Sequence, residues 1–296
     1  AAARLLALPA AELGAALGIA GSMSSGLFAY LGDGAATKPI HAGWAAHGGI
    51  VAAELAHAGG EGPSGVFEDR FGFFAAYYGL DASAIEAQVA DLGSRYETPR
   101  IAFKPYPACH FIHSSLDAAA ELLRAHPLTA AEIARITVAV PEPGVPLVLE
   151  PLAAKRDPRT EYDAKFSLPY SIAALIVHGR VGVETYTEAA IRDPAVLELA
   201  ARVEHVPREF PTYPQSFPGW VRIESRAGDV LELGLAHQRG GPENPMSEDE
   251  VVAKFRENAA LALGEAAVDA LEHAILELEQ QHDLAACLAP LRRSLD

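Results

Sequence analysis

Two lysines stand directly before prolines, in the segments TKPIHAGWAAHGG (residues 37–49) and FKPYPACHFIH (residues 103–113). Proline fits the first turn of a helix, so each segment predicts a helix start with a lysine beside it. A lysine at this end is electrostatically unfavourable, because the helix dipole already makes the N-terminus positive. An anion held between the lysine and the exposed amide groups would reverse that effect. Both segments therefore indicate a site for a carboxylate or a phosphate.

In the first segment, Thr37, Lys38 and Pro39 mark the predicted helix start, and His41 lies in the first turn. Residues that are three or four positions apart form a stripe along one face of this predicted helix, and this face is expected to pack closely against a neighbouring element. The stripe consists of His41, Ala45, Gly48, Ala52 and Leu55. Thr37, Lys38 and His41 are therefore candidate anion-binding residues. The alternative from this segment alone is a solvated lysine beside a packed histidine.

The second segment adds two candidates for proton transfer, His110 and His113. Its prolines keep the chain extended after Lys104, so a helix is expected to start near Ala108. The spacing of three places both imidazoles on one helix face, with Asp117 as the next polar residue. A neutral histidine is a competent general acid or base, and a nearby positive helix end would lower its pKa. The alternatives are a buried His113 bonded to the backbone and a zinc site, for which no third ligand stands at a diagnostic spacing.

A third candidate, Tyr170, follows a basic stretch. The segment KRDPRT (residues 155–160) concentrates basic residues in an acidic chain, and YDAKFSLPY (residues 162–170) ends at another helix start led by proline. The hydroxyl of Tyr170 could donate to an anion or act as an acid. The alternative is a basic surface loop with a packed tyrosine. The sequence contains no Walker A, HExxH or G-x-S-x-G motif.

The composition limits the class of function. The chain has 296 residues, 50% of them hydrophobic, which predicts a globular protein of one or two domains. Its net charge of −16 disfavours nucleic acids and anionic membrane surfaces as partners. No apolar run approaches the roughly 20 residues that span a bilayer. Cys109 and Cys287 are too few for a disulfide framework or an iron–sulfur cluster, which favours a reducing, cytoplasmic compartment.

The elements that must position these residues fall into three parts. Residues 1–101 show helical periodicity broken by glycines, as at Gly32-Asp33-Gly34, and predict the first part of a helical domain. Residues 102–237 mix helical and strand patterns and predict an α+β domain. Residues 238–296 begin near a capping box at Ser247 and return to helix. The expected fold is mainly α, with an α+β unit inserted into a helical domain.

Within the middle part, the expected elements are marked by local signals. Helices are predicted from Ser114 to Ala125 and from Tyr170 to His178, the second ended by Gly179. Alternating residues predict a strand at 135–140 and a hairpin made of residues 220–225 and 229–233.

Several ordered blocks of the chain resemble one family. They are GIAGSMSSGL, TKPIHAGWAAHGG, FEDRFGFFAAY, FKPYPACHFIH, YDAKFSLPY and ENPMSEDEVVAKFRENA. Together they are similar to the MmgE/PrpD family, which includes 2-methylcitrate dehydratases, cis-aconitate decarboxylases and iminodisuccinate epimerases. The resemblance extends over nearly the whole chain. It implies a helical domain built from both chain ends, a smaller α+β lid, an active site in the cleft between them, and usually a homodimer.

The resemblance also assigns roles by position. It implies that Lys38 and Lys104 are the two active-site lysines and that Tyr170 is the lid tyrosine. Cys109 falls where the decarboxylases have a catalytic histidine, and His110 lies one position later, whereas His113 matches a histidine that recurs more generally. This departure favours dehydration or epimerisation. The family's chains carry a further helical segment, with a Gly-Phe-His motif, upstream of where this sequence starts, so a fragment of a larger enzyme is expected.

The sequence thus predicts a lyase without cofactor or metal that dehydrates a small polycarboxylate similar to 2-methylcitrate. Lys38 and Lys104 would hold carboxylates and stabilise the aci-carboxylate that forms as the α-proton leaves. His110 or His113 would move the proton, and Tyr170 would assist the departing hydroxyl or orient a carboxylate.

Thr37, His41 and Cys109 are expected to contact the substrate. The expected partners are this substrate and a second copy of the chain, with no nucleic acid and no membrane. The alternatives are an epimerase of the iminodisuccinate type, a decarboxylase of the cis-aconitate type, and a non-catalytic dimeric protein that binds anions.

Overall fold

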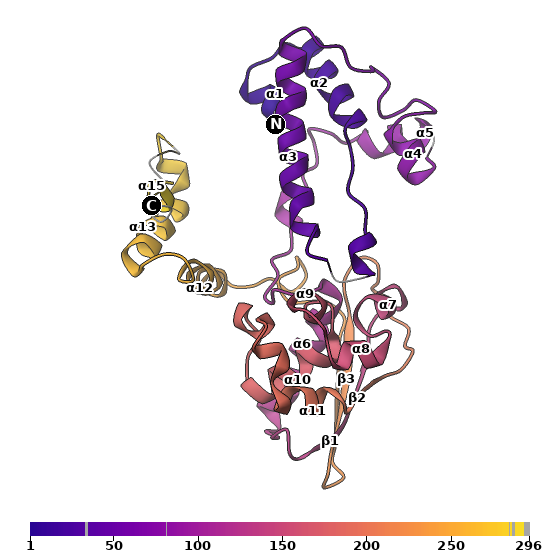
Figure 1. Cartoon of the computed structure of the whole chain (residues 1–296), viewed down its shortest axis with the longest axis vertical. Coiled ribbons are helices and arrows are strands. Elements are labelled where there is room, and N and C mark those ends of the chain that lie inside the picture. Colours follow the sequence, from indigo (N-terminus) through magenta and orange to yellow (C-terminus); the bar gives the residue numbers. More distant parts are fainter. Residues whose placement is uncertain (33–34, 81, 284, 286–287, 293–296) are drawn as a thin grey trace. The chain divides into compact units, whose positions relative to one another are not determined.

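The computed structural model describes residues 1–32, 35–80, 82–283, 285 and 288–292. The chain forms two compact units, Ala1–Thr98 and Pro99–Asp296 (Figure 1). Asp33, Gly34 and Cys287, which entered the sequence predictions, lie outside the described residues. The division at residues 101 and 237, with a helical domain built from both chain ends, stays a prediction.

The first unit is helical, as the periodicity predicted. Its elements are α1 (Ala2–Leu5), α2 (Ala10–Ser22), the 3₁₀ turn η1 (Ala29–Leu31), α3 (Lys38–His57), α4 (Phe73–Tyr78) and α5 (Ala82–Val89), and the turn η2 (Thr98–Arg100) follows. Helices α1 and α2 both pack on α3 (Figure 1). Small side chains allow this close approach, because Ala16 of α2 and Ala53 and Ala56 of α3 form much of the buried cluster.

Helix α3 begins at Lys38 with Thr37 as its N-cap residue, so the proline signal placed this start correctly. Lys38 is itself helical rather than extended, and the Thr37 side chain makes no capping hydrogen bond. The predicted stripe was only partly right, because Ala45 is exposed and Leu55 is 48% exposed. The buried residues of α3 are Gly48, Ala52, Ala53 and Ala56. They form a face rotated from the predicted one because α1 and α2 pack on that side.

The second unit combines helices with a small sheet. Its helices are α6 (His113–Ala125), α7 (Val145–Val148), α8 (Leu152–Arg156), α9 (Glu161–Ala164), α10 (Leu168–His178), α11 (Pro194–Ala200), α12 (Glu248–Ala259), α13 (Glu265–Leu276) and α15 (Ala289–Arg292). Its 3₁₀ turns are η3 (His110–Ile112), η4 (Glu142–Gly144), η5 (Val183–Tyr186), η6 (Ala190–Arg192) and η7 (Leu278–Gln280). The structure confirms a mainly helical protein with a small α+β part.

Local end signals account for several of these helices. Gly179 has a φ of 74° and ends α10, as predicted, because glycine adopts the left-handed conformation at low cost. Ser247 accepts a hydrogen bond from the Glu250 amide in the predicted capping box before α12.

The sheet has the strand order β2-β1-β3-β4. The strands are β1 (Ile133–Ala139), β2 (Val203–His205), β3 (Gly219–Ser225) and β4 (Val230–Leu235). The antiparallel hairpin β3–β4 confirms the sequence prediction, and β1 pairs antiparallel with β3. Strand β2 was not predicted. It has only three residues and pairs parallel with β1, placing Val203 opposite Ile136.

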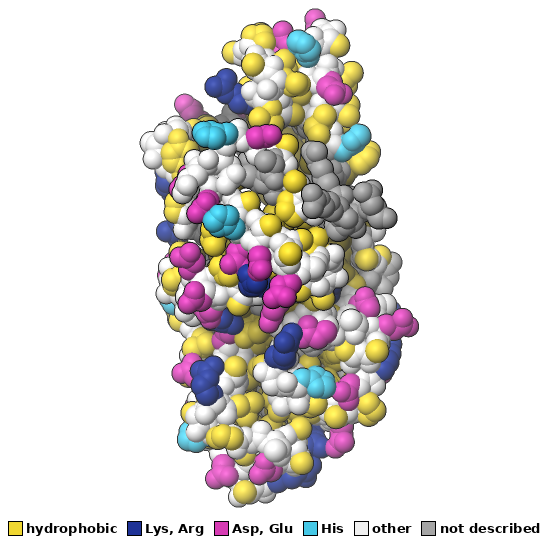
Figure 2. Space-filling view, turned by 90° about the vertical axis from the view of Figure 1, so that its left-hand side faces the viewer, with side chains coloured by type: hydrophobic (Ala, Val, Ile, Leu, Met, Phe, Trp, Pro, Cys, Tyr) yellow, Lys and Arg dark blue, Asp and Glu magenta, His cyan; other side chains and the backbone are white. Residues whose placement is uncertain are grey.

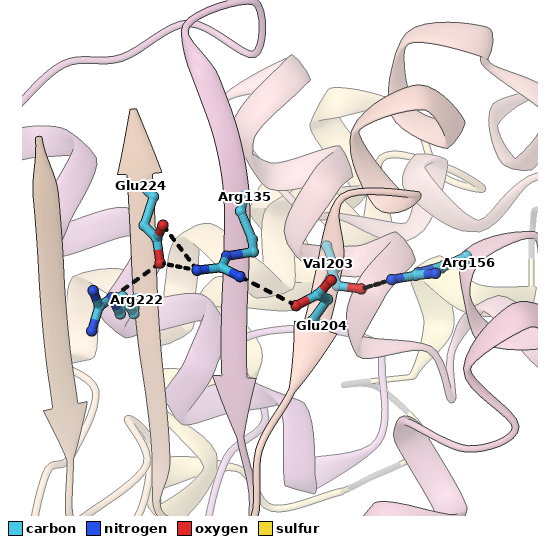
Figure 3. A network of polar contacts seen from close by, with 6 residues as sticks. All are labelled: Arg135, Arg156, Val203, Glu204, Arg222 and Glu224. Carbon is cyan, nitrogen blue, oxygen red and sulfur yellow. Dashed lines mark hydrogen bonds and ion pairs between the residues drawn. The ribbon is translucent and has the colours of Figure 1, made fainter. Parts of the chain in front are cut away.

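The two faces of the sheet differ. Helix α6 packs on β3 and β4, and α10 packs on α6 and α11, so the core lies on this side. The opposite face carries a ladder of charges, in which Arg135 Nη2 lies 2.8 Å from Glu224 Oε1 and Arg135 Nη1 lies 3.8 Å from Glu204 Oε2 (Figure 3). At the β2 edge, Arg156 donates two hydrogen bonds to the Val203 carbonyl, which covers an otherwise open strand edge (Figure 3).

Each unit contains one of the two tryptophans of the chain. Trp44 of α3 is 52% exposed, and its ring lies 5.4 Å from that of His47. Trp220 of β3 is 8% exposed, and the guanidinium of Arg208 lies 4.8 Å from its ring centroid. The two indoles therefore sit in different surroundings.

The described surface is charged and mixed. Figure 2 shows Asp and Glu side chains interspersed with Lys and Arg over the face that it draws. Among the described residues, no helix combines the length and the apolar character needed to cross a membrane.

Candidate active site

The backbone around Lys104 is fixed by a contact with a distant glycine. The Phe103 amide donates to the Gly240 carbonyl at 2.9 Å, and the Gly240 amide donates to the Asn244 carbonyl at 2.7 Å. Gly240 has a φ of 88°, and a Cβ built there would lie 1.9 Å from the Phe103 carbonyl oxygen. Only glycine fits this position without a backbone shift. The segment that carries Lys104 is thus held by residues far along the sequence.

One carbonyl oxygen joins Lys104 to His113. Lys104 Nζ donates to the Ala108 carbonyl at 3.1 Å, and His113 Nε2 lies 3.3 Å from the same oxygen. A carbonyl can only accept, so Nε2 of His113 carries the hydrogen and Nδ1 keeps the lone pair. The arrangement sets the tautomer of a histidine that is 0% exposed.

His110 and His113 are neighbours, with ring centroids 4.9 Å apart. The structure confirms the predicted helix from Ser114 to Ala125, because α6 spans His113–Ala125. The earlier start expected near Ala108 is wrong, because Cys109 is extended and His110 lies in the turn η3. Proline on both sides of Tyr106 keeps the preceding chain out of helical geometry. The two rings therefore meet across a 3₁₀ turn and the first residue of a helix.

Both histidines are held neutral near pH 7. Burial and the nearby charge of Lys104 lower the pKa of His110 to about 4. Burial first, and then the neighbouring His110, hold the pKa of His113 well below its usual value. The lowered pKa of both histidines agrees with the sequence prediction. Its main cause, however, is burial away from solvent and not the positive end of a helix. His110 is covered by Phe217, whose ring stacks on the imidazole at 4.6 Å and 15°.

Each imidazole has a buried nitrogen, Nε2 of His110 and Nδ1 of His113. Within the described part of the chain, neither nitrogen has a hydrogen-bond partner. Buried polar atoms are usually hydrogen-bonded, so such atoms need an explanation. A ligand or a transferred proton would satisfy them.

Three further polar residues surround His113, and the sequence analysis gave them no role. The Tyr106 ring contacts His113 edge-on at 5.4 Å, and its hydroxyl donates to Asp117 Oδ1 at 2.7 Å. Arg239 Nε lies 3.4 Å from the same carboxylate oxygen. Tyr106 stands inside the motif that holds Lys104 and His110, which was a usable signal. No sequence motif marked Arg239, because it comes close to Asp117 only in the folded protein.

Cys109 and Tyr170 occupy different environments. Cys109 is partly buried, and its amide donates to the Lys165 carbonyl at 2.9 Å. Tyr170 lies in the first turn of α10, which begins at Leu168, earlier than predicted. It is 1% exposed, and its hydroxyl donates to the Thr185 carbonyl at 2.7 Å. Burial, with a smaller contribution from Asp193, raises the pKa of Tyr170 to about 12. A role of Tyr170 at the substrate stays a prediction and requires this hydrogen bond to break.

The other candidates lie in the first unit. Thr37 and His41 line a largely apolar pocket of about 690 Å³ with Trp44, and the His41 ring lies 5.8 Å from that of Tyr30. Lys38 is exposed at the start of α3. The structure thus gathers the site residues in two groups, one in each unit. A single site formed by both groups stays a prediction.

The donor chemistry does not resemble a metal centre. No set of three or more His, Cys, Asp or Glu side chains suited to a metal ion occurs among the described residues. The histidine pair would supply two ligands, whereas structural and catalytic zinc sites use three or four protein ligands.

Comparison with known proteins gives a consistent family match. The chain matches the MmgE/PrpD N-terminal domain over residues 1–85 and the MmgE/PrpD C-terminal domain over residues 106–280. Cis-aconitate decarboxylase of Homo sapiens is 29% identical over 86% of this chain and 53% of the relative. Cis-aconitate decarboxylase of Mus musculus is 29% identical over 85% and 51%, respectively. The cis-aconitate decarboxylase-like protein oryM of Aspergillus oryzae is 26% identical over 97% and 61%.

The chain therefore spans between about half and three fifths of the length of these curated relatives.

Proposed function

The chain belongs to the MmgE/PrpD family, and we propose that it acts as a lyase on a small polycarboxylate, without a cofactor. The observation that carries this proposal is the cluster of Lys104, His110 and His113. It combines a lysine that attracts a carboxylate with two imidazoles that are neutral at pH 7. These are the groups needed to remove a proton next to a carboxylate.

In the proposed reaction, Lys104 binds a substrate carboxylate and stabilises the charge that develops on it as the α-proton leaves. His110 or His113 accepts this proton on its lone-pair nitrogen. The carboxylates of the bound substrate would raise the pKa of the imidazoles, which brings them closer to the range where a general base works well. Lys38 is proposed to bind a second carboxylate, with Thr37 and His41 beside it.

The finer proposal is dehydration of a substrate similar to 2-methylcitrate. Loss of the α-proton to a histidine and of the hydroxyl as water leaves a carbon–carbon double bond, and Tyr170 is proposed to protonate the departing hydroxyl. Support comes from the order Cys109-His110, which differs from the arrangement expected of a decarboxylase. Cys109 is proposed to contact the substrate.

Decarboxylation of cis-aconitate is the second candidate, and the names of the curated relatives favour it. In this reaction the carbon–carbon bond to a carboxylate breaks, CO₂ leaves, and a protonated group returns a proton to the substrate. The same lysines and histidines serve both reactions, because each passes through a carbanion-like species next to a carboxylate.

Incubating the intact protein separately with 2-methylcitrate and with cis-aconitate distinguishes these reactions. An ultraviolet-absorbing alkene formed from 2-methylcitrate supports dehydration, and CO₂ released from cis-aconitate supports decarboxylation. Deuterium entering the α-carbon of an amino-dicarboxylate, without alkene, would instead indicate an epimerase. Binding of these acids without any turnover would overturn the proposal in favour of an anion-binding protein.

A homodimer is also proposed, from the family relationship alone. Light scattering of the purified protein should give twice the mass of one chain, and a monomeric mass at micromolar concentration would contradict this.

A further inference from the structure

The residues next to His113 that the proposed mechanism does not use form a connected set. Tyr106 places its ring edge against the His113 imidazole, with an angle of 75° between the rings. Its hydroxyl reaches Asp117, which lies one turn after His113 on α6. His113 and Asp117, the residue that holds the Tyr106 hydroxyl, thus lie on the same helix.

Arg239 balances the charge of Asp117. Its Nε lies 3.4 Å from Asp117 Oδ1, its Nη1 lies 2.6 Å from Glu250 Oε1, and its guanidinium carbon lies 5.8 Å from the Tyr106 ring centroid. A paired carboxylate can stay ionised while mostly buried. Burial and the Asp117 charge raise the pKa of Tyr106 above its usual range, so the hydroxyl keeps its proton and remains a donor.

We propose that Asp117 is a positioning residue for His113 and that it acts through the hydroxyl and ring of Tyr106. With Tyr106 held by Asp117, its ring limits rotation of the imidazole. The imidazole then keeps Nε2 on the Ala108 carbonyl, and Nδ1 remains available to take a proton. This inference rests on the proposed function of His113 in proton transfer. It adds the residues that keep this histidine in one orientation and one tautomer.

Three variants of the intact protein test the proposal. Tyr106→Phe removes the hydroxyl, and Asp117→Ala removes its acceptor, so each should lower kcat about tenfold with little change in KM. The double variant should lose no more than either single variant, because both remove the same link. Asp117→Asn keeps an oxygen that can accept from Tyr106 and should stay within about twofold of the parent protein.

Ser225→Ala is the matched control. The Ser225 hydroxyl donates to Asp229 Oδ2 at 3.0 Å in the same unit, so the substitution likewise removes a hydrogen bond from a hydroxyl to a carboxylate, and neither residue belongs to the proposed site. Ser225→Ala should lower thermal stability to a similar degree as Tyr106→Phe and leave kcat unchanged. An equal loss of kcat in the control would assign the effect to general destabilisation and overturn the proposal.

A readout independent of turnover separates this proposal from the proposed function. Nitrogen-15 NMR of the histidine rings should show His113 with hydrogen on Nε2 in the parent protein and in Asp117→Asn. A shifted or mixed tautomer is expected in Tyr106→Phe and Asp117→Ala. An unchanged tautomer in those two variants would contradict positioning, even in an inactive protein. If the tautomer changes as expected but the parent protein shows no turnover, the proposed function is contradicted and the positioning role of Asp117 is not.

Discussion

Lys104 and His113 hydrogen-bond to the same oxygen, the carbonyl of Ala108, at 3.1 Å and 3.3 Å. The shared acceptor links a lysine before the two prolines to a neutral imidazole at the start of α6. A change in either side chain therefore alters the surroundings of the other.

Lys104→Ala should lower kcat/KM by about 10- to 150-fold, because a charge-assisted hydrogen bond to a carboxylate contributes roughly 1.5–3 kcal/mol. A still larger loss confined to kcat would mean that Lys104 stabilises charge that appears only in the transition state. Steady-state kinetics of the intact protein with the best substrate measures both values.

Lys165→Ala serves as the control for that variant. Lys165 belongs to the same unit, and its contact with Cys109 runs through its backbone carbonyl, which the substitution keeps. Its kinetics should match those of the parent protein. Unchanged kinetics in Lys104→Ala would show that Lys104 is not part of the active site.

Gly240→Ala should destabilise the protein by about 2–4 kcal/mol, from backbone strain and from the clash with the Phe103 carbonyl. Gly228→Ala is the matched control, since Gly228 has a φ of 97° but open space around the added Cβ. Gly228→Ala should lower the free energy of unfolding by only about 1 kcal/mol. Urea unfolding compares the two, and equal losses would show that the contact with the Lys104 segment is unimportant.

The lowered pKa of His110 predicts acid sensitivity. Above pH 6.5 an unfolded and a folded imidazole are both neutral, so His110 adds no pH dependence there. Between pH 6.5 and about 4 the unfolded chain binds a proton that folded His110 resists, so stability falls as the pH drops through this window. His110→Gln should show a smaller loss of unfolding midpoint between pH 7 and pH 5. The same loss in His110→Gln and in the parent protein would mean that His110 does not cause the acid sensitivity.

Dialysis against a chelator should leave turnover unchanged, since the histidine pair lacks a third donor among the described residues. Activity that disappears on dialysis and returns with added zinc or iron would contradict this prediction.

The features that the sequence predicted correctly depend on local chemistry. Pro39 marked the start of α3, Gly179 the end of α10, and Ser247 the cap of α12, because each acts within a few residues of itself. The features that it missed depend on distant partners. Strand β2 exists because Val203 pairs with Ile136, and Arg239 joins the histidine region by reaching Asp117.

The same distinction applies within the site. The spacing of His110 and His113 was enough to predict that their rings are neighbours. The cause of their low pKa was not predictable, because Phe217 and the rest of the burying shell come from other parts of the chain.

The two tryptophans allow the two units to be observed separately by fluorescence. Trp44 is largely exposed in the first unit and should emit at longer wavelength, whereas the buried Trp220 of the second unit should emit at shorter wavelength. Trp44→Phe leaves an emission signal from the sheet beside the histidine region, and Trp220→Phe leaves one from α3. A denaturation experiment on each single-tryptophan protein would then report whether the units lose their structure together or in sequence.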